Sequence, residues 1–237
     1  MADFVLVHGA WGGGWQWRDV AERLRAAGHA VFTPTLTGMG ERAHLLTADV
    51  DLETHISDVM GVIEYEGLRD VALVAHSYGG MVATGVADRL SERIAALIYL
   101  DAALPEDGQA MLDLVSAERR ATVTRLAGEE GGGIAAPPSL VLETGIADAA
   151  ERAAFLARTC AHPLAALLQP IRLSGTFRKV PRKAYILAGI ANSHRFRAYM
   201  EWARAEPGWI AEELPSHHFP MATMPGETAA LLMRLAA

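Results

Sequence analysis

Short apolar runs and segments of helical periodicity alternate along the first hundred residues. The apolar runs are rich in Val, Ile and Leu, which is typical of strands buried on both faces. Between them, apolar residues recur every three or four positions, which predicts amphipathic helices. We expect strands at 4–7, 30–34, 71–75 and 94–100, and helices at 16–27, 52–66 and 79–90. This alternation predicts an α/β fold, a mostly parallel sheet with helices on both faces.

The alternation stops after Pro105 and returns near residue 184. Residues 106–178 are mostly helical in pattern, with a Gly- and Pro-rich break at 128–138. We interpret 105–178 as an all-helical cap inserted over the carboxyl edge of the sheet, so that 1–104 and 179–237 form the core. In the second part of the core we expect strands at 184–188 and 209–214 and helices at 196–205 and 228–235.

Two residues mark helix ends. Gly28 follows the first helical segment where a residue of positive φ commonly ends a helix. Asp51 precedes the next helical segment and is a favourable N-cap residue. The stretch between them at 36–50 has no clear period and predicts a long loop.

Composition narrows the class of protein. The chain has 237 residues, 51% of them hydrophobic and 21% charged, which fits one folded domain with a sizeable core. Its net charge of −7 argues against a nucleic-acid partner. No apolar run reaches the ~20 residues of a membrane span, and the N-terminus lacks a signal-peptide pattern, so we expect a cytoplasmic protein without a membrane partner. The oligomeric state stays open, a homodimer included.

The single cysteine, Cys160, excludes an internal disulfide and a cysteine-based zinc site. We interpret it as a small, half-buried apolar residue.

The stretch V-A-L-V-A-H-S-Y-G-G at 71–80 places Ser77 on a turn between a buried strand and a helix. This is the arrangement of a nucleophile elbow, where the residues two before and two after the serine must be small. They are Ala75 and Gly79, so the pattern is A-x-S-x-G. The alternative is an ordinary serine between a strand and a helix.

A serine nucleophile needs a histidine base and a group that orients this base. In enzymes with this elbow, the chain order is Ser, acid, His. Of the nine histidines, six precede the serine, abut it or lie in the expected cap: His8, His29, His44, His55, His76 and His162. His194, His217 and His218 remain, and the last two lie in the loop after the final strand, where the base belongs.

Two backbone N–H groups must face the oxyanion of the reaction intermediate. We expect them from Tyr78, directly after the nucleophile, and from Ala10, in the loop after the first strand. The glycines at 12–14 resemble a phosphate-binding loop, but no Lys-Ser/Thr pair follows, so this interpretation is disfavoured. Gly9 and Trp11 are expected to line the substrate pocket.

Four motifs carry a family resemblance: F-V-L-V-H-G-A-W-G-G-G-W-Q-W, A-H-S-Y-G-G, Y-L-D-A-A-L-P-E-D-G and H-F-P-M. Together they resemble the hydroxynitrile lyase and methylesterase family of α/β-hydrolases, which includes plant methyl-salicylate and methyl-jasmonate esterases. The resemblance covers almost the whole chain and is weakest in the cap. It implies the α/β-hydrolase fold, with about six strands. The family's base stands three residues before a methionine, which here selects His218, three before Met221.

Two departures from the lyase members point to ester hydrolysis. These members carry threonine or asparagine after the first-strand histidine, where this chain has Gly9. The plant lyases also place a lysine beside the catalytic aspartate, whereas the corresponding stretch here is G-I-A-N at 189–192.

The acid of the triad is missing from the family's usual position. It should fall at Ala191, and no Asp or Glu occurs between Ala184 and Tyr199. Asp101, at the end of the strand after the elbow helix, is the preferred candidate, as in some lipases of this fold. Asn192 is the alternative.

We therefore predict a serine carboxylesterase that acts on small or medium apolar or aromatic esters through an acyl-enzyme, with no cofactor or metal. One alternative is a hydroxynitrile lyase with the same triad. The other is a non-catalytic small-molecule-binding member of the family, which the absence of the usual acid motivates.

Overall fold

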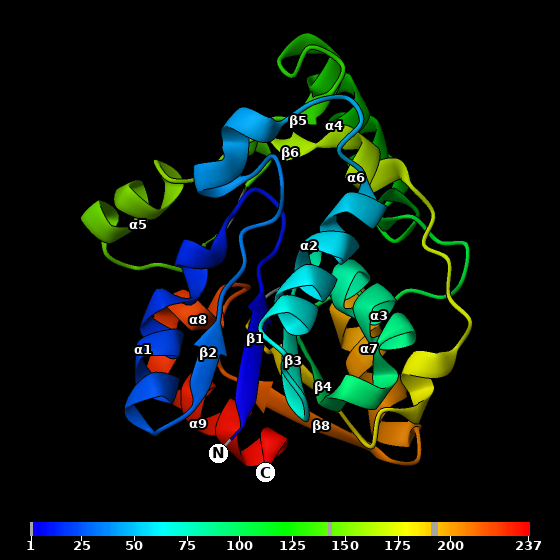
Figure 1. Cartoon of the computed structure of the whole chain (residues 1–237). Coiled ribbons are helices and arrows are strands. Elements are labelled where there is room, and N and C mark those ends of the chain that lie inside the picture. The colour runs from blue at the N-terminus through cyan, green and yellow to red at the C-terminus, as the bar shows by residue number, and fades with distance from the viewer. Residues whose placement is uncertain (1, 142–143, 191–193) are drawn as a thin grey trace.

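The computed structural model describes residues 2–141, 144–190 and 194–237. Its main feature is a six-stranded sheet in which every pair of neighbours is parallel, with strand order β2-β1-β3-β4-β7-β8 (Figure 1). The bounds are β1 (Asp3–Val7), β2 (Ala30–Phe32), β3 (Val71–His76), β4 (Ile94–Leu100), β7 (Arg182–Ala188) and β8 (Trp209–Leu214). The predicted parallel α/β sheet is confirmed.

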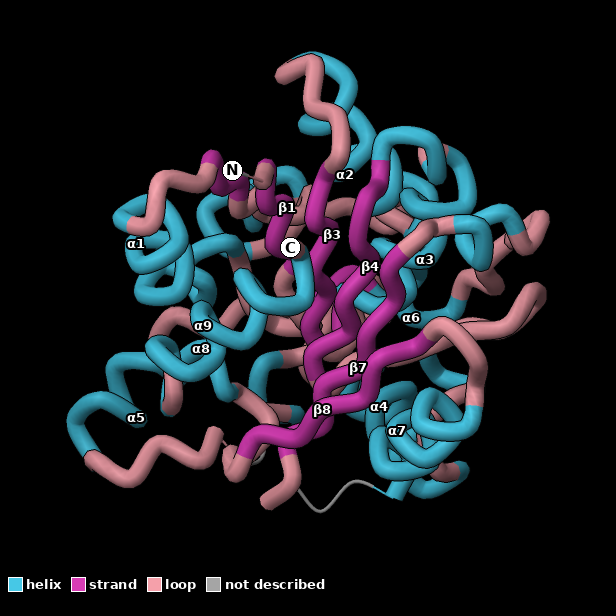
Figure 2. The backbone as a smooth tube through the Cα atoms, turned by 90° about the horizontal axis from the view of Figure 1, so that it is seen from below, coloured by secondary structure: helices cyan, strands magenta, loops and turns pink. Residues whose placement is uncertain are grey.

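Helices cover both faces of the sheet (Figure 2). Alternate strand residues enter two separate cores, because successive side chains of a strand point to opposite faces. Val5 and Val7 share one core with α2 (Leu52–Tyr65), α3 (Gly79–Arg89) and α7 (His194–Ala205). Phe4 and Leu6 share the other with α1 (Arg18–Ala26) and α9 (Pro225–Ala236). Burial on both faces explains why the strands are continuously apolar.

The predicted helix ends are present, with local differences. Gly28 has φ of +89° after α1. Asp51 accepts a hydrogen bond from the Thr54 N–H in a capping box at the start of α2. The predicted helix at 16–27 is a 3-10 turn, η1 (Gly14–Trp17), followed by α1. The predicted loop at 36–50 contains a 3-10 turn, η2 (Gly40–Leu45).

The segment between β4 and β7 begins above the carboxyl ends of the strands in Figure 1, and its last part runs down the side of the molecule past α3. We retain residues 105–178 as the proposed cap. It is not purely helical, because β5 (Ala135–Ala136) and β6 (His162–Pro163) form a short antiparallel ladder. Its helical elements are η4 (Met111–Asp113), α4 (Ala117–Glu129), η5 (Pro138–Leu140), α5 (Ala149–Leu156), α6 (Leu164–Leu168) and η6 (Thr176–Lys179).

Two short helical elements of the core remain, η3 (Ser91–Arg93) and α8 (Pro220–Thr223). Within the described ranges, no helix combines the length and the apolar character needed to cross a membrane.

Candidate active site

Ser77 lies at the sharp turn from β3 into α3 and has φ of +53°. A non-glycine residue rarely adopts this conformation, so the surroundings must hold it in place. The serine carbonyl accepts hydrogen bonds from the N–H groups of Gly80 and Ala103. A Cβ at Gly79 would lie 2.8 Å from the His8 carbonyl oxygen, which explains the small residue at this position.

Asp101 and His218 complete a continuous chain of hydrogen bonds with Ser77. His218 Nε2 lies 3.0 Å from Ser77 Oγ, and His218 Nδ1 lies 2.6 Å from Asp101 Oδ2. The Asp101 side chain is fully buried, and its Oδ1 accepts a hydrogen bond from the Ala188 N–H at 3.2 Å. The arrangement can withdraw a proton from the serine hydroxyl and stabilise the resulting imidazolium.

Strand register brings Ser77 and Asp101 together. His76, the last residue of β3, pairs with Leu100, the last residue of β4. The next residues therefore leave neighbouring strands at the same level, and both turn sharply, since Asp101 also has a positive φ, +44°. His218 reaches them from the loop after β8.

The alternatives weighed from the sequence lie elsewhere. His217 packs against Gly145, where an added Cβ would lie 2.2 Å from the His217 Cβ. Asn192, the alternative acid position, is outside the described residues. The ring of His194 is not described either.

His76 also contributes to this site, although its place beside the serine offered no signal in the sequence. Its Nε2–H donates a hydrogen bond to the His218 carbonyl at 2.7 Å. The side chain is fully buried, and burial lowers its pKa well below the usual value, so the ring is neutral. His76 thus holds the main chain of His218, while the Phe196 ring stacks on the His218 imidazole at 5.4 Å.

The two expected oxyanion donors, the backbone amides of Ala10 and Tyr78, flank the elbow. Within the described residues, neither amide donates a hydrogen bond to the protein. The buried His8 ring braces the first loop: Nδ1–H donates to the Gly9 carbonyl at 2.8 Å, and Nε2 accepts from the Leu36 N–H at 3.1 Å. Burial lowers the pKa of His8 to about 4, which keeps this ring neutral.

Gly9 and Trp11 have distinct environments. A Cβ at Gly9 would lie 2.8 Å from His76 Nδ1 and 2.9 Å from the Ser77 Cβ, so this position has no room for a side chain. The Trp11 indole N–H donates to the Ala136 carbonyl in β5 at 3.1 Å, and Trp11 therefore joins the first loop to the proposed cap. Their assignment to the substrate pocket stays a prediction.

Two further histidines surround the Tyr78 ring. The Tyr78 hydroxyl donates to His55 Nδ1 at 2.8 Å, and His55 Nε2–H donates to the Thr37 carbonyl at 2.9 Å. His162, in β6, packs edge-on against the Tyr78 ring at 4.5 Å. Burial lowers the pKa of both histidines, so we assign them a structural role under the elbow. No described cluster of three or more His, Cys, Asp or Glu side chains is arranged to hold a metal ion.

Comparisons with known proteins show what the whole chain is similar to. A family model described as "Alpha/beta hydrolase family" matches residues 4–231. The chain is 44% identical over 244 residues to the carbendazim hydrolyzing esterase of Nocardioides sp. (strain SG-4G), an alignment that covers 99% of this chain and 100% of that protein. Methylesterase 7 of Arabidopsis thaliana is 35% identical over 105 residues, which are 44% of this chain and 40% of that protein.

A comparison with solved structures shows that the fold is similar over almost the whole chain. An extracellular alpha/beta-hydrolase from Paenibacillus species superposes with a TM-score of 0.85 at 26% identity, covering 99% of both chains. That protein is described as sharing structural and functional homology with tobacco salicylic acid binding protein 2.

Proposed function

The chain belongs to the alpha/beta hydrolase family and is an ester hydrolase, and from that premise we propose that it acts through a triad of Ser77, His218 and Asp101. The observation that carries the proposal is the unbroken line of hydrogen bonds from the serine hydroxyl through the imidazole to a buried carboxylate. This line has the order and contacts that activate a serine nucleophile.

Each group has a defined step. Ser77 Oγ attacks the acyl carbon while its proton passes to His218 Nε2, and the amides of Ala10 and Tyr78 bind the oxyanion that forms. Asp101 accepts the Nδ1–H bond, fixes the tautomer and stabilises the imidazolium. The imidazolium then protonates the leaving alcohol. Water, deprotonated by His218, releases the acid from the acyl-enzyme and restores Ser77.

We extend the proposal to small or medium apolar esters, aromatic ones included. Relatives named as a carbendazim hydrolyzing esterase and a methylesterase support the hydrolysis of ester substrates. The lyase alternative is disfavoured because the position of Gly9 has no space for the threonine or asparagine side chain found in the lyases. No cofactor or metal takes part in the proposed steps.

Labelling with a fluorophosphonate tests the nucleophile. We expect one equivalent of label on the native chain, placed on Ser77 by peptide mass spectrometry. Ser77→Ala should take up none and lose ~10⁴-fold or more in kcat on a p-nitrophenyl ester. A folded Ser77→Ala protein that retains a tenth of the native kcat would contradict the mechanism.

A further inference from the structure

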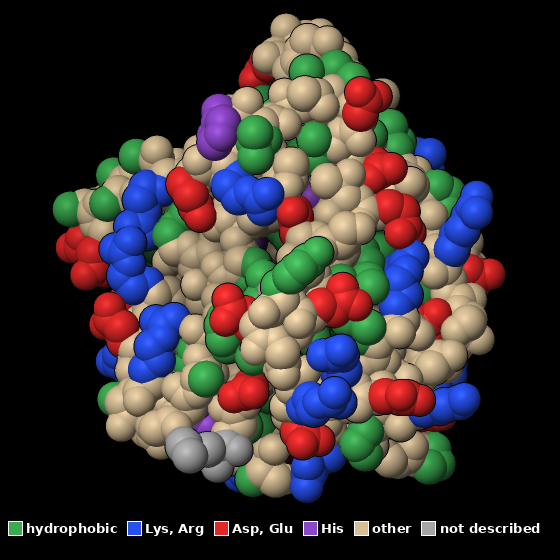
Figure 3. Space-filling model, in the orientation of Figure 1, with side chains coloured by type: hydrophobic (Ala, Val, Ile, Leu, Met, Phe, Trp, Pro, Cys, Tyr) green, Lys and Arg blue, Asp and Glu red, His purple; other side chains and the backbone are tan. Residues whose placement is uncertain are grey.

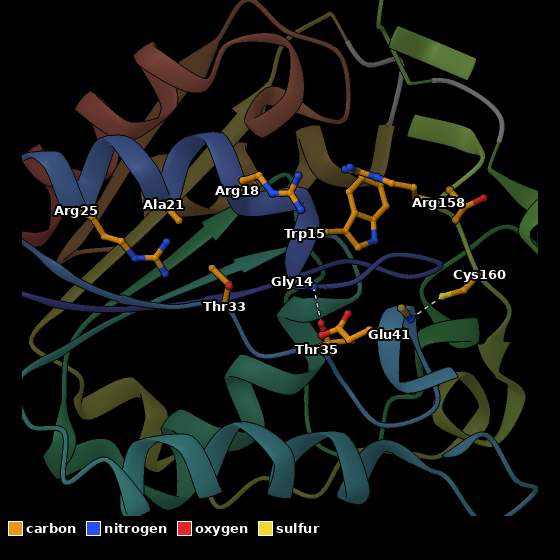
Figure 4. A pocket seen from close by; sticks show the side chains of 12 residues that line it. Gly14, Trp15, Arg18, Ala21, Arg25, Thr33, Thr35, Glu41, Arg158 and Cys160 are labelled. Atoms are coloured by element: carbon orange, nitrogen blue, oxygen red, sulfur yellow. Dashed lines mark hydrogen bonds between the residues drawn. The ribbon is translucent and has the colours of Figure 1, made fainter. Parts of the chain in front are cut away.

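A cavity of about 730 Å³ lies on the α1 side of the molecule (Figure 4). Its walls come from η1 and α1, from the chain after β2, from η2, and from residues 158–160 of the proposed cap. None of the described residues that line it belongs to the proposed triad. It is therefore distinct from the proposed triad.

The walls of this cavity carry an excess of positive charge. Arg18, Arg25 and Arg158 line it together with one carboxylate, that of Glu41, although the chain has a net charge of −7. Among the described residues, no ion pair engages any of the three arginines. In Figure 3, basic side chains gather along the left edge of a hollow over this side of the molecule. Such a wall attracts anions.

Two of the guanidinium groups are held in place by the protein. Arg158 lies over the Trp15 ring at 4.0 Å, and Phe155 packs edge-on against the same ring at 5.0 Å. Arg25 Nη2 donates to the Val31 carbonyl at 2.7 Å, which orients the group without neutralising it. Fixed donors lose less entropy when they bind a ligand.

The positive charges of Arg18 and Arg158, which both line the cavity, also repel one another. Burial, and then the positive charge of Arg18, lower the pKa of Arg158, while Asp19 acts in the opposite direction. An anion placed between the two guanidinium groups would remove this repulsion and form charge-assisted hydrogen bonds with both. The Thr35 hydroxyl also lines the cavity and can act as a donor. Its oxygen already accepts a hydrogen bond from the Gly14 N–H at 2.8 Å, so its own O–H remains able to donate to a bound anion.

We propose that this cavity is a binding site for a phosphate group, either inorganic phosphate or the phosphate of a small ester, held by Arg18 and Arg158. Bound phosphate would connect α1 of the core to residue 158 of the proposed cap. The site is independent of the proposed triad, so failure of either proposal leaves the other standing.

The test is calorimetric titration of the full chain with inorganic phosphate, at an ionic strength held constant with sodium chloride. Arg18→Gln and Arg158→Gln should each weaken binding by about five- to tenfold, since each removes a charged donor. Glu41→Gln should tighten binding, because it removes the carboxylate found among the described residues of the wall. Arg23→Gln is the matched control, as Arg23 is an exposed residue of α1 that does not line the cavity.

Thermal unfolding gives a second readout, since a ligand that binds only the folded chain raises Tm with its concentration. Equal effects of phosphate and chloride on Tm, or equal phosphate affinities for Arg18→Gln, Arg158→Gln and Arg23→Gln, would overturn the proposal. Succinate binding as tightly as phosphate would overturn the assignment to phosphate.

Discussion

Asp101 occupies a position that differs from the acid of the resembled family, at the end of β4 rather than after β7. An acid at this position can reach the catalytic base, because β4 is paired with β3 and the register of the two strands places Asp101 level with Ser77. Complete burial of the carboxylate and its 2.6 Å contact with His218 Nδ1 favour an orienting role.

Asp101→Asn tests that role. The amide fills the same volume but carries no negative charge to stabilise the imidazolium, and its NH₂ group can face Nδ1 and favour the wrong imidazole tautomer, so kcat should fall by ~10³-fold or more. Tm should change little. Stopped-flow or steady-state kinetics and a melting curve on the same preparation give both quantities.

His217→Ala is the matched control, because His217 neighbours the base but packs on Gly145. Its kcat should stay within roughly tenfold of the native value. A folded Asp101→Asn protein with native kcat, or a larger loss in His217→Ala than in His218→Ala, would show that the triad is assigned incorrectly.

At the scale of elements, the nucleophile elbow depends on the close approach of α3 to the ends of β1 and β4. A Cβ at Gly80 would lie 1.9 Å from the Ala103 carbonyl oxygen, a backbone atom that cannot move away by rotating a side chain. The glycines after Ser77 are therefore packing requirements as well as features of a motif.

Gly80→Ala should lower the free energy of unfolding by about 2 kcal/mol or more, through overpacking at the elbow. Gly128→Ala is the matched control, since Gly128 lies in α4 with nothing within 4 Å of an added Cβ. Alanine is the better helix former, so the control should gain up to about 1 kcal/mol. Urea unfolding measures both, and similar midpoints for the two variants would contradict the packing argument.

At the scale of the whole molecule, the first loop of the core is tied to the proposed cap. The Trp11 side chain donates to Ala136, and the Trp11 carbonyl accepts from the Cys160 N–H at 3.0 Å. The same loop carries the Ala10 amide, so a movement of the cap would be transmitted to the proposed oxyanion site.

Trp11→Phe retains an aromatic ring but removes the indole N–H. We expect faster amide hydrogen exchange in residues 134–137 and 160–164, because the ladder loses one of its links to the core. Trp202→Phe, an exposed tryptophan of α7, serves as control and should leave exchange there unchanged. Equal exchange in both variants and the native chain would mean that the ladder is held without this bond.

The sequence by itself determined the parallel sheet, the elbow and the class of chemistry. Its hydrophobic periodicity reports which faces are buried, and strands buried on both faces between amphipathic helices have few other arrangements. Ser77 could be identified as the nucleophile from the sequence, because a buried strand precedes it and the small residues Ala75 and Gly79 lie two positions before and after it. The choice of His218 over His217 as the base, in contrast, rested on the family resemblance alone, because both histidines lie in the same loop.

Only the tertiary structure brought Asp101 to His218, because these residues are 117 positions apart and meet where the end of β4 lies beside the loop after β8. The same reason applies to His76, which reaches the His218 carbonyl across 142 positions. The β5–β6 ladder has two residues in each strand, too few to leave a period in the sequence. The arginine-lined cavity likewise gathers side chains from distant segments, and their shared charge exists only once the chain is folded.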